Sequence, residues 1–312
     1  MKKFQQVLLI GCKRPEFTLK QLDQLNNLSR LSIFLSIDRS TRYIENKFKK
    51  ELLQFSKNIN PSNSFEHEIQ SEKLGLVKHI NKSITRQFES SDSLLILEDD
   101  ILIQPKGIVS LINGLNSFSR FESFGAIGGF SPLWRNSLIE KVFENRWRLT
   151  PYFPVWGWGT VKRVWEPFNV AVNLDLEMEF LKKSTRWNNL SEFQKNVWIG
   201  RINKVYRNPE YTWDIQFQIE LFKRNLDVYL PLYSLVGNIG YGDFTATNTK
   251  DSKPFWIKNS TNKLSNHLQS KTLGKSFNKL FIVLDSLFIG GDAYILQKWI
   301  YFRNYLRKLN KR

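Results

Sequence analysis

Cysteine and histidine are scarce in this sequence of 312 residues, which has Cys12 as its one cysteine and three widely separated histidines. One cysteine cannot form an internal disulfide, and no Cys/His cluster has the spacing of a zinc site, so a reducing compartment without structural zinc is expected. Isolated histidines lie more often at surface or helix positions than in binding sites, so a histidine-centred site is not expected either.

Long apolar runs are also absent. The first run, at residues 7–11, follows Gln5 and Gln6 and is too short for the core of a signal peptide, so it predicts a buried strand and no export signal. In the region 280–305 the charged residues Asp285, Asp292 and Lys298 interrupt the apolar patches, so no segment is expected to span a bilayer. We therefore expect a cytoplasmic protein.

Negative charge is in deficit, with 29 Asp and Glu residues against 46 Lys and Arg residues and a net charge of +17. This excess indicates an anionic partner and says nothing about the fold. No zinc finger, helix-turn-helix or RNP-like pattern is present, so a nucleic-acid partner is not expected. Phosphorylated substrates and an anionic membrane surface remain as candidate partners.

The first hundred residues alternate short apolar runs with amphipathic stretches. This alternation predicts an α/β fold with parallel strand pairing. The expected strands are residues 7–10, 31–37, 65–69 and 94–97, and the expected helices are residues 17–27, 43–58 and 77–88.

From about residue 125 the chain becomes rich in aromatic residues with Gly and Pro between them. We expect helices at residues 161–169, 174–183 and 213–225, the last with Thr212 as N-cap, and a strand at residues 226–230. Residues 245–279 read as a polar connector. The basic segment 280–305 carries Trp299, Tyr301 and Phe302, which favours peripheral contact with an anionic membrane; packing back onto the protein is the alternative.

Three adjacent carboxylates, Glu98, Asp99 and Asp100, directly follow the apolar run 94–97. Ligands of open α/β sheets bind outside the carboxyl ends of such strands. Adjacent carboxylates repel one another unless a cation neutralises them, and oxygen ligands suit magnesium or manganese. A divalent ion that holds a diphosphate is one explanation; a solvated acidic loop that caps a helix is the other.

Five stretches in a fixed order extend this pattern. They are residues 12–15 (Cys-Lys-Arg-Pro), 36–38 (Ser-Ile-Asp), 72–75 (Glu-Lys-Leu-Gly), 97–100 (Leu-Glu-Asp-Asp) and 156–159 (Trp-Gly-Trp-Gly), the last followed by Trp213 and Asp214. The ordered set resembles GT-A type glycosyltransferases, most closely the bacterial sugar transferases labelled hemolytic-protein-like. It is more distantly similar to Golgi N-acetylglucosaminyltransferase I.

The resemblance implies a GT-A, Rossmann-like, mostly parallel central sheet flanked by helices. Residues 1–250 would form the catalytic domain, with a nucleotide-binding half (1–120) and an acceptor half (121–250). Residues 251–312 would form the polar connector and a basic, amphipathic, helical C-terminal extension.

For the donor, the resemblance implies that Asp100 binds Mn²⁺ or Mg²⁺ and that Glu98 and Asp99 lie near the sugar and ribose. Arg14 follows the first strand, where a cation meets the diphosphate or base, and a surface turn is its alternative. Asp38 would accept from uracil or ribose, with a turn role as its alternative. Lys73 precedes a helix whose amides approach the nucleotide, and it is equally suited to a solvated position.

For the acceptor, Asp214 is the candidate general base of an inverting transfer, and stabilisation of its own helix is the alternative. Trp156, Trp158 and Trp213 would offer ring faces to a sugar or acceptor, with a core role as the alternative. The resembled family usually has a histidine where this chain has Asn248. That departure puts metal binding or activity in question.

The sequence therefore predicts an inverting, metal-dependent glycosyltransferase. Its donor is a nucleoside diphosphate sugar, with uridine as the expected base, and its acceptor a surface-polysaccharide or lipid-linked glycan. It would act in the cytoplasm, with contact to the inner face of the membrane as an open addition. A sugar nucleotidylyltransferase and a non-catalytic binder of polyanions or membrane surfaces are the alternatives.

Overall fold

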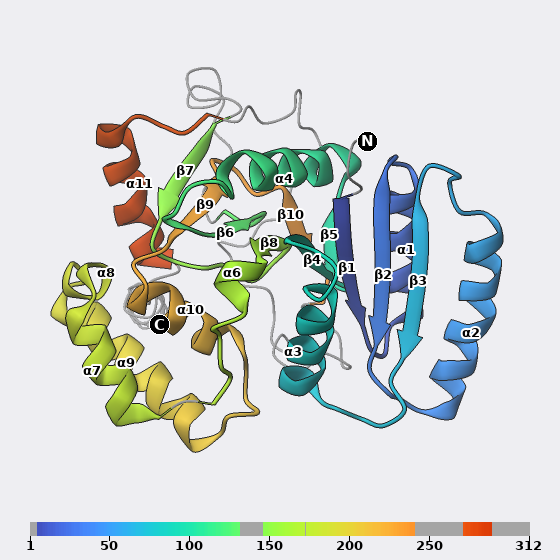
Figure 1. Ribbon diagram of the computed structural model, residues 1–312, viewed down its shortest axis with the longest axis horizontal. Helices are drawn as coiled ribbons and strands as arrows, with labels where there is room; N and C mark the ends of the chain where they lie inside the picture. Colours follow the sequence, from blue (N-terminus) through green and yellow to red (C-terminus); the bar gives the residue numbers. More distant parts are fainter. Residues whose placement is uncertain (1–4, 132–145, 172, 241–270, 289–312) are drawn as a thin grey trace, which may run out of the picture.

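The computed structural model describes residues 5–131, 146–171, 173–240 and 271–288 (Figure 1). They contain an eight-stranded sheet with the order β3-β2-β1-β4-β8-β6-β9-β7 and a two-stranded pair, β10-β5. The pairings β2–β3, β1–β2, β1–β4 and β6–β9 are parallel, whereas β8 and β7 run antiparallel to their neighbours. The predicted α/β class with a mostly parallel central sheet is confirmed.

The first half of the chain alternates strands and helices as the sequence predicts. Each expected element is present, with bounds shifted by two residues at most. The elements are β1 (Gln5–Gly11), α1 (Pro15–Asn26), β2 (Leu31–Ile37), α2 (Arg42–Lys57), β3 (Ser64–Ile69), α3 (Leu76–Gln87) and β4 (Ser93–Glu98).

The second half is less regular. The helix expected at residues 161–169 spans only Lys162–Trp165; Pro167, which has no N–H to continue the helical hydrogen bonds, follows its C-cap residue Glu166. The helix expected at 174–183 has those bounds. The elements are β5 (Ile101–Ile103), α4 (Pro105–Phe118), β6 (Phe124–Gly128), β7 (Trp147–Thr150), β8 (Trp158–Val161), α6 (Lys162–Trp165), α7 (Leu174–Lys183), α8 (Thr185–Asn188), α9 (Glu192–Arg207), α10 (Asp214–Lys223), β9 (Asp227–Pro231) and β10 (Val236–Asn238).

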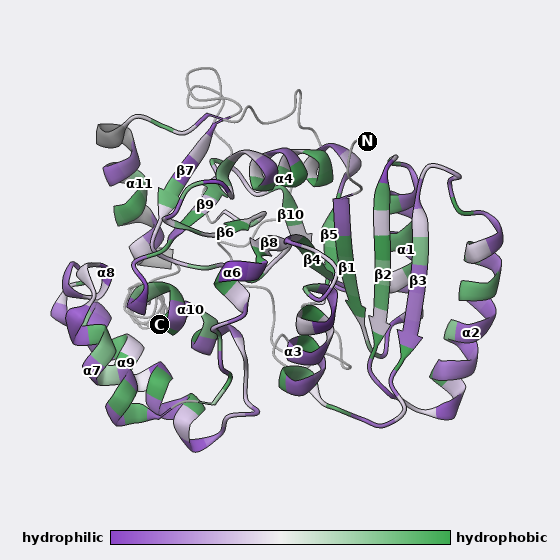
Figure 2. Cartoon of the chain, in the orientation of Figure 1, coloured by the Kyte–Doolittle hydropathy of each residue, from purple (hydrophilic) through white to green (hydrophobic). Residues whose placement is uncertain are grey.

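Two apolar clusters hold these elements together. The larger one joins the central strands to α1, α2, α3, α4 and the inner face of α10, and a smaller one lies between α7, α9 and α10. Figure 2 shows the result along the sheet, where the central strands are largely hydrophobic and the outer elements β3 and α2 carry many hydrophilic residues. The carboxyl ends of β1, β2 and β4 are thereby fixed on a rigid layer.

The C-terminal helix α11 (Lys275–Phe288) lies against the edge strand β7 (Figure 1). Trp147 donates its N–H to the carbonyl of Lys271 at 2.9 Å, and the Asn278 side chain bonds both the N–H (2.7 Å) and the carbonyl (3.0 Å) of Leu149. The prediction of a polar connector over 245–279 is therefore wrong for residues 271–279, because they satisfy the open edge of the sheet. The remainder of that connector lies outside the described residues.

The membrane-contact segment is described only as far as Phe288. Trp299, Tyr301, Phe302 and the variant position Asn248 lie outside the described residues. Within the described ranges, no helix has both the length and the apolar character needed to cross a bilayer.

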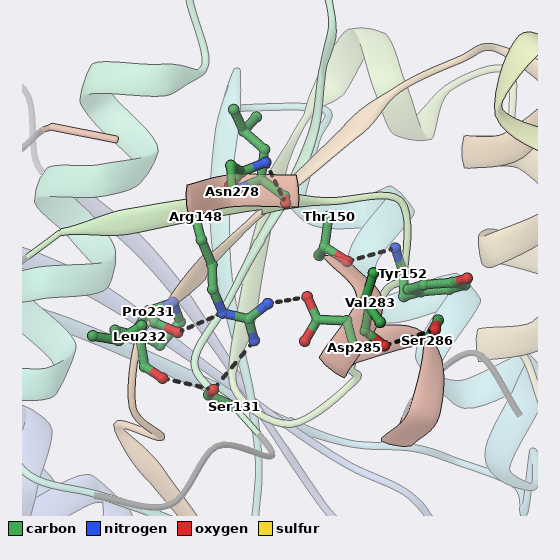
Figure 3. Close-up of polar contacts among 11 residues, drawn as sticks. Ser131, Arg148, Thr150, Tyr152, Pro231, Leu232, Asn278, Val283, Asp285 and Ser286 are labelled. Atoms are coloured by element: carbon green, nitrogen blue, oxygen red, sulfur yellow. Dashed lines mark hydrogen bonds and ion pairs between the residues drawn. The ribbon is translucent and has the colours of Figure 1, made fainter. Parts of the chain in front are cut away.

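A buried ion pair joins α11 to the sheet (Figure 3). Arg148 of β7 pairs through Nη1 with Asp285 of α11, and both side chains are 0% exposed. The same guanidinium donates to the carbonyl of Pro231 at 3.3 Å and to Ser131 Oγ at 3.2 Å. Burial raises the pKa of Asp285, and the charge of Arg148 opposes that change. Each charge of this pair therefore depends on the other.

A buried histidine makes stability depend on pH. His79 of α3 is 3% exposed, and its Nε2 lies 2.8 Å from Ser36 Oγ of β2. Burial lowers the pKa of His79 from 6.5 to about 4. Between these values the unfolded chain binds the proton more readily than the folded chain does. The stabilisation from neutral His79 is thus present above about pH 6.5 and is lost as the pH falls toward 4.

We expect the titration of His79 to lower the free energy of unfolding by about 2 kcal/mol when the pH falls from about 7 to about 5. In His79→Gln, which keeps a hydrogen-bonding side chain without a titration in this range, most of that dependence should disappear. Urea unfolding of both proteins at the two pH values measures it. Equal pH dependence in the two proteins would show that His79 does not titrate as its burial requires.

Candidate active site

The candidate site lies where the strand order changes direction. From β1 the chain adds β2 and β3 on one side and then returns to place β4 on the other side. Asp38 donates its N–H to the carbonyl of Gly11 at 3.0 Å, and Asp99 donates its N–H to that of Ile10 at 2.9 Å. The residues that follow the three strands therefore meet at one edge of the sheet, at the position where open α/β sheets bind ligands.

Arg14 joins two of the predicted carboxylates. Its Nη2 pairs with Asp99 Oδ1 and lies 3.3 Å from Asp100 Oδ2. The other oxygen of Asp99 accepts the N–H of Cys12 at 3.4 Å, and Asp99 is 4% exposed. Within the described part of the chain, Arg14 Nη1 is buried and has no hydrogen-bond acceptor. One donor of this guanidinium thus lacks an acceptor among the described residues.

Negative charge exceeds positive charge at this edge. Burial, followed by the charges of Asp100, Asp99 and Asp214, raises the pKa of Glu98 well above its usual range. Burial raises the pKa of Asp99 to about 7 although the charge of Arg14 opposes the change. One guanidinium therefore does not compensate three carboxylates, and an added cation would stabilise their ionised forms.

The segment after β10 packs directly on Asp100. Ile239 donates its N–H to the carbonyl of Asp100 at 2.9 Å, and a Cβ atom on Gly240 would lie 2.4 Å from Asp100 Oδ2 and 2.9 Å from Arg14 Nη1. A side chain at position 240 would therefore displace the Arg14–Asp100 pair. Sequence reasoning gave Gly240 no role.

Asp38 holds the loop that contains Lys73. Its carboxylate accepts the N–H groups of Arg39 and Leu74, each at 2.9 Å, and that of Gly75 at 3.0 Å. Gly75 has φ of +77°, a conformation that glycine adopts without the steric cost of a Cβ. Lys73 is exposed, and its charge acts on the pKa of Cys12, which burial raises to about 11. Asp38 thus has the turn role that the sequence gave as its alternative, and its bonds to the distant residues Leu74 and Gly75 were not predicted.

Asp214 is the first residue of α10 and belongs to the same charged group, because its charge contributes to the raised pKa of Glu98. Thr212 Oγ1 donates to Asp214 Oδ1. The prediction that Thr212 caps the helix is wrong, since Trp213 is the N-cap residue and no side chain caps this end. The threonine hydroxyl bonds the carboxylate instead.

The three candidate tryptophans separate into two kinds. Trp158 and Trp213 are 0% and 3% exposed, and their rings stack on each other with centroids 5.2 Å apart. The prediction that these two offer ring faces to a sugar is wrong, because both rings are buried in the core beside Phe153 and Phe217. Trp156 is half-buried and packs edge-on against Phe130 at 4.6 Å, so it remains a candidate.

The residues present suit a metal that is shared with a substrate. Among the described residues, no group of three or more His, Cys, Asp or Glu side chains is arranged to hold a metal ion. Mg²⁺ is commonly bound by one or two carboxylates together with substrate phosphates and water. Asp100, beside uncompensated carboxylates, fits that mode, whereas a cage built entirely from protein ligands does not.

No family model and no curated protein matches the chain. The chain is similar to the glycosyltransferase GlyE of Streptococcus pneumoniae TIGR4, with 10% identity over 67% of this chain and 44% of that chain and a TM-score of 0.32. It is also similar to 4-diphosphocytidyl-2C-methyl-D-erythritol synthase of Anaerococcus prevotii DSM 20548 (8% identity, 90% and 96% covered, TM-score 0.38).

A third similar structure is a UDP-glucose pyrophosphorylase complexed with UDP-glucose (9% identity, 74% and 91% covered, TM-score 0.35). The chain spans less than half the length of GlyE. The fold class follows from the strand order and pairing given above.

Proposed function

We propose that this chain is an inverting, metal-dependent glycosyltransferase that uses a nucleoside diphosphate sugar, with uridine as its base. The observation that carries the proposal is the convergence of Arg14, Asp99 and Asp100 between β1 and β4, with Asp214 acting on Glu98 from the second half of the chain. A cation and carboxylates on the donor side and a separate carboxylate on the acceptor side are the groups that such a transfer requires.

Arg14 is proposed to bind the diphosphate. A phosphate oxygen would accept from the buried Nη1, which lacks an acceptor among the described residues. Asp100 would hold Mn²⁺ or Mg²⁺ together with the diphosphate, and the metal would supply Lewis-acid stabilisation of the leaving group. Asp99, bonded to Arg14 and to the Cys12 amide, fixes the direction of the guanidinium.

The loop held by Asp38 is proposed to lie against the nucleoside. Backbone groups of residues 72–75 are fixed by the bonds from Leu74 and Gly75 to Asp38, and Lys73 adds a positive charge at the same edge. Glu98 lies at the end of β4, where the charges of Asp100 and Asp214 act on it, and it would face the transferred sugar. Trp156 would offer its ring to the acceptor.

Asp214 is proposed to take the proton of the acceptor hydroxyl. The hydroxyl oxygen then attacks the anomeric carbon from the face opposite the diphosphate, which leaves with the bonding electron pair. The acceptor is proposed to be a surface-polysaccharide or lipid-linked glycan, and the charge of +17 would favour residence near an anionic membrane.

A thermal-shift panel of nucleoside diphosphate sugars, with and without manganese, tests the proposal. We expect a uridine diphosphate sugar to raise the melting temperature in the presence of manganese and EDTA to remove most of the effect. Stabilisation by heparin that ignores manganese and vanishes with salt would indicate a polyanion binder. Stabilisation by no sugar nucleotide would overturn the donor assignment.

A further inference from the structure

Two groups that sequence reasoning did not assign to the site act on the Asp214 carboxylate. The first is Thr212, a buried residue whose Oγ1 donates to Asp214 Oδ1. An ordinary N-terminal threonine would direct this hydroxyl to a backbone amide of the helix. Here the N-cap residue is Trp213, with φ of −111° and ψ of −24°, so the Thr212 hydroxyl serves the carboxylate.

The second group is Arg201 of α9. Its guanidinium carbon lies 4.3 Å from the centroid of the Trp198 ring, and Trp198 is itself buried. Burial lowers the pKa of Arg201, and the charges of Asp214 and Tyr152 oppose that change. A fixed cation of weak hydration therefore lies within electrostatic reach of the carboxylate.

Two further groups act electrostatically in this cluster. Glu98 lies at the end of β4, and the charge of Asp214 contributes to its raised pKa. Tyr152, buried just after β7, acts on Arg201. Arg201 thus offsets Glu98, and the Thr212 hydroxyl bonds one of the two oxygens of Asp214.

We propose that Thr212 and Arg201 are positioning residues that orient Asp214, with Oδ1 bonded and Oδ2 presented to the acceptor hydroxyl. This inference rests on the proposed function. During transfer the acceptor proton moves to Oδ2, the acceptor oxygen bonds the anomeric carbon, and the bond to the diphosphate breaks. Thr212 keeps its proton throughout, so neither residue is catalytic.

Replacement of Thr212 tests the first contact. Thr212→Val removes the hydroxyl at nearly constant volume and should lower kcat by about 10- to 100-fold, because a hydrogen bond to a charged group is lost. The KM for the donor should not change. Thr212→Ser, which restores the hydroxyl, should recover most of the lost kcat.

Thr185→Val is the matched control. Thr185 is the first residue of α8, and its hydroxyl also bonds a side chain, Asn225 Oδ1, at 2.8 Å. It should leave kcat and the KM for the donor unchanged. Arg201→Lys, which keeps the charge, tests the role of Arg201 and should lower kcat less than Arg201→Met does. If Thr212→Val unfolds below the assay temperature, the variants Thr212→Ser, Arg201→Lys and Arg201→Met still test the inference.

An unchanged kcat in Thr212→Val would overturn the inference, as would equal losses of kcat in the valine and serine variants. Asp214→Asn separates this failure from that of the proposed function. If Asp214→Asn transfers sugar normally, the base assignment itself is wrong. If Asp214→Asn is inactive and Thr212→Val is normal, positioning by Thr212 alone is wrong.

Discussion

Replacement of Asp214 by asparagine is expected to lower glycosyl transfer by about 100- to 10,000-fold and to leave donor affinity unchanged. The amide has almost the shape of the carboxylate but cannot take the proton of the acceptor hydroxyl. Donor affinity should persist because the residues proposed to hold the diphosphate, Arg14 and Asp100, belong to the other half of the chain. Initial rates of transfer and calorimetric titration of the donor measure the two quantities separately.

Asp175 provides the matched control, since it also lies in the first turn of a helix, α7. An aspartate that only stabilises its helix contributes about 0.3–1 kcal/mol, so Asp175→Asn should reduce stability slightly and leave transfer intact. If Asp214→Asn behaves like Asp175→Asn, with near-normal turnover, Asp214 is a helix-stabilising residue and not the base.

Removal of one member of the buried pair in Figure 3 is expected to cost about 3–5 kcal/mol of unfolding free energy. Asp285→Ala leaves the Arg148 guanidinium, 0% exposed, without its anion. The lost contact also loosens α11 from β7, where Asn278 bonds the backbone of Leu149. Urea unfolding followed by tryptophan fluorescence gives the free energy.

Two further variants separate charge burial from general damage to α11. The double variant Arg148→Met, Asp285→Leu fills the same space without charge and should recover most of the loss. Glu179→Gln removes an exposed ion pair with Lys183 on α7 and should change nothing measurable. Asp285→Ala with wild-type stability would contradict the view that residues 271–288 are part of the folded core.

Most of the first half of the fold could be predicted because β1, β2 and β4 are short apolar runs and the helices between them have clear periodicity. The second half could not, since β7 and β8 have four residues each and pair with strands distant in the sequence. The helix α9 was detectable in principle, because Ser191 and Gln194 form a capping box at its start. The position of α11 could not be predicted, because its polar residue Asn278 bonds the backbone of β7, a strand distant in the sequence.

The candidate site was predictable where charge follows a buried strand, as for Arg14 and Asp100. It was not predictable where burial decides: the sequence does not distinguish the core rings of Trp158 and Trp213 from the half-buried ring of Trp156. Thr212, Arg201 and Gly240 act through contacts with residues from other elements. Proximity of Thr212 to Asp214 in the chain was the one available signal.

Calorimetric titration of a uridine diphosphate sugar in the presence of manganese tests the central claim most directly. The wild-type protein should bind it, and Asp100→Asn and Arg14→Met should each weaken binding by at least about tenfold, because each removes a charge-assisted contact to the diphosphate or its metal. Glu16→Gln, which removes an ion pair with Lys47 on the outer helices, should bind as the wild type does. Undiminished binding by both Asp100→Asn and Arg14→Met would contradict the account.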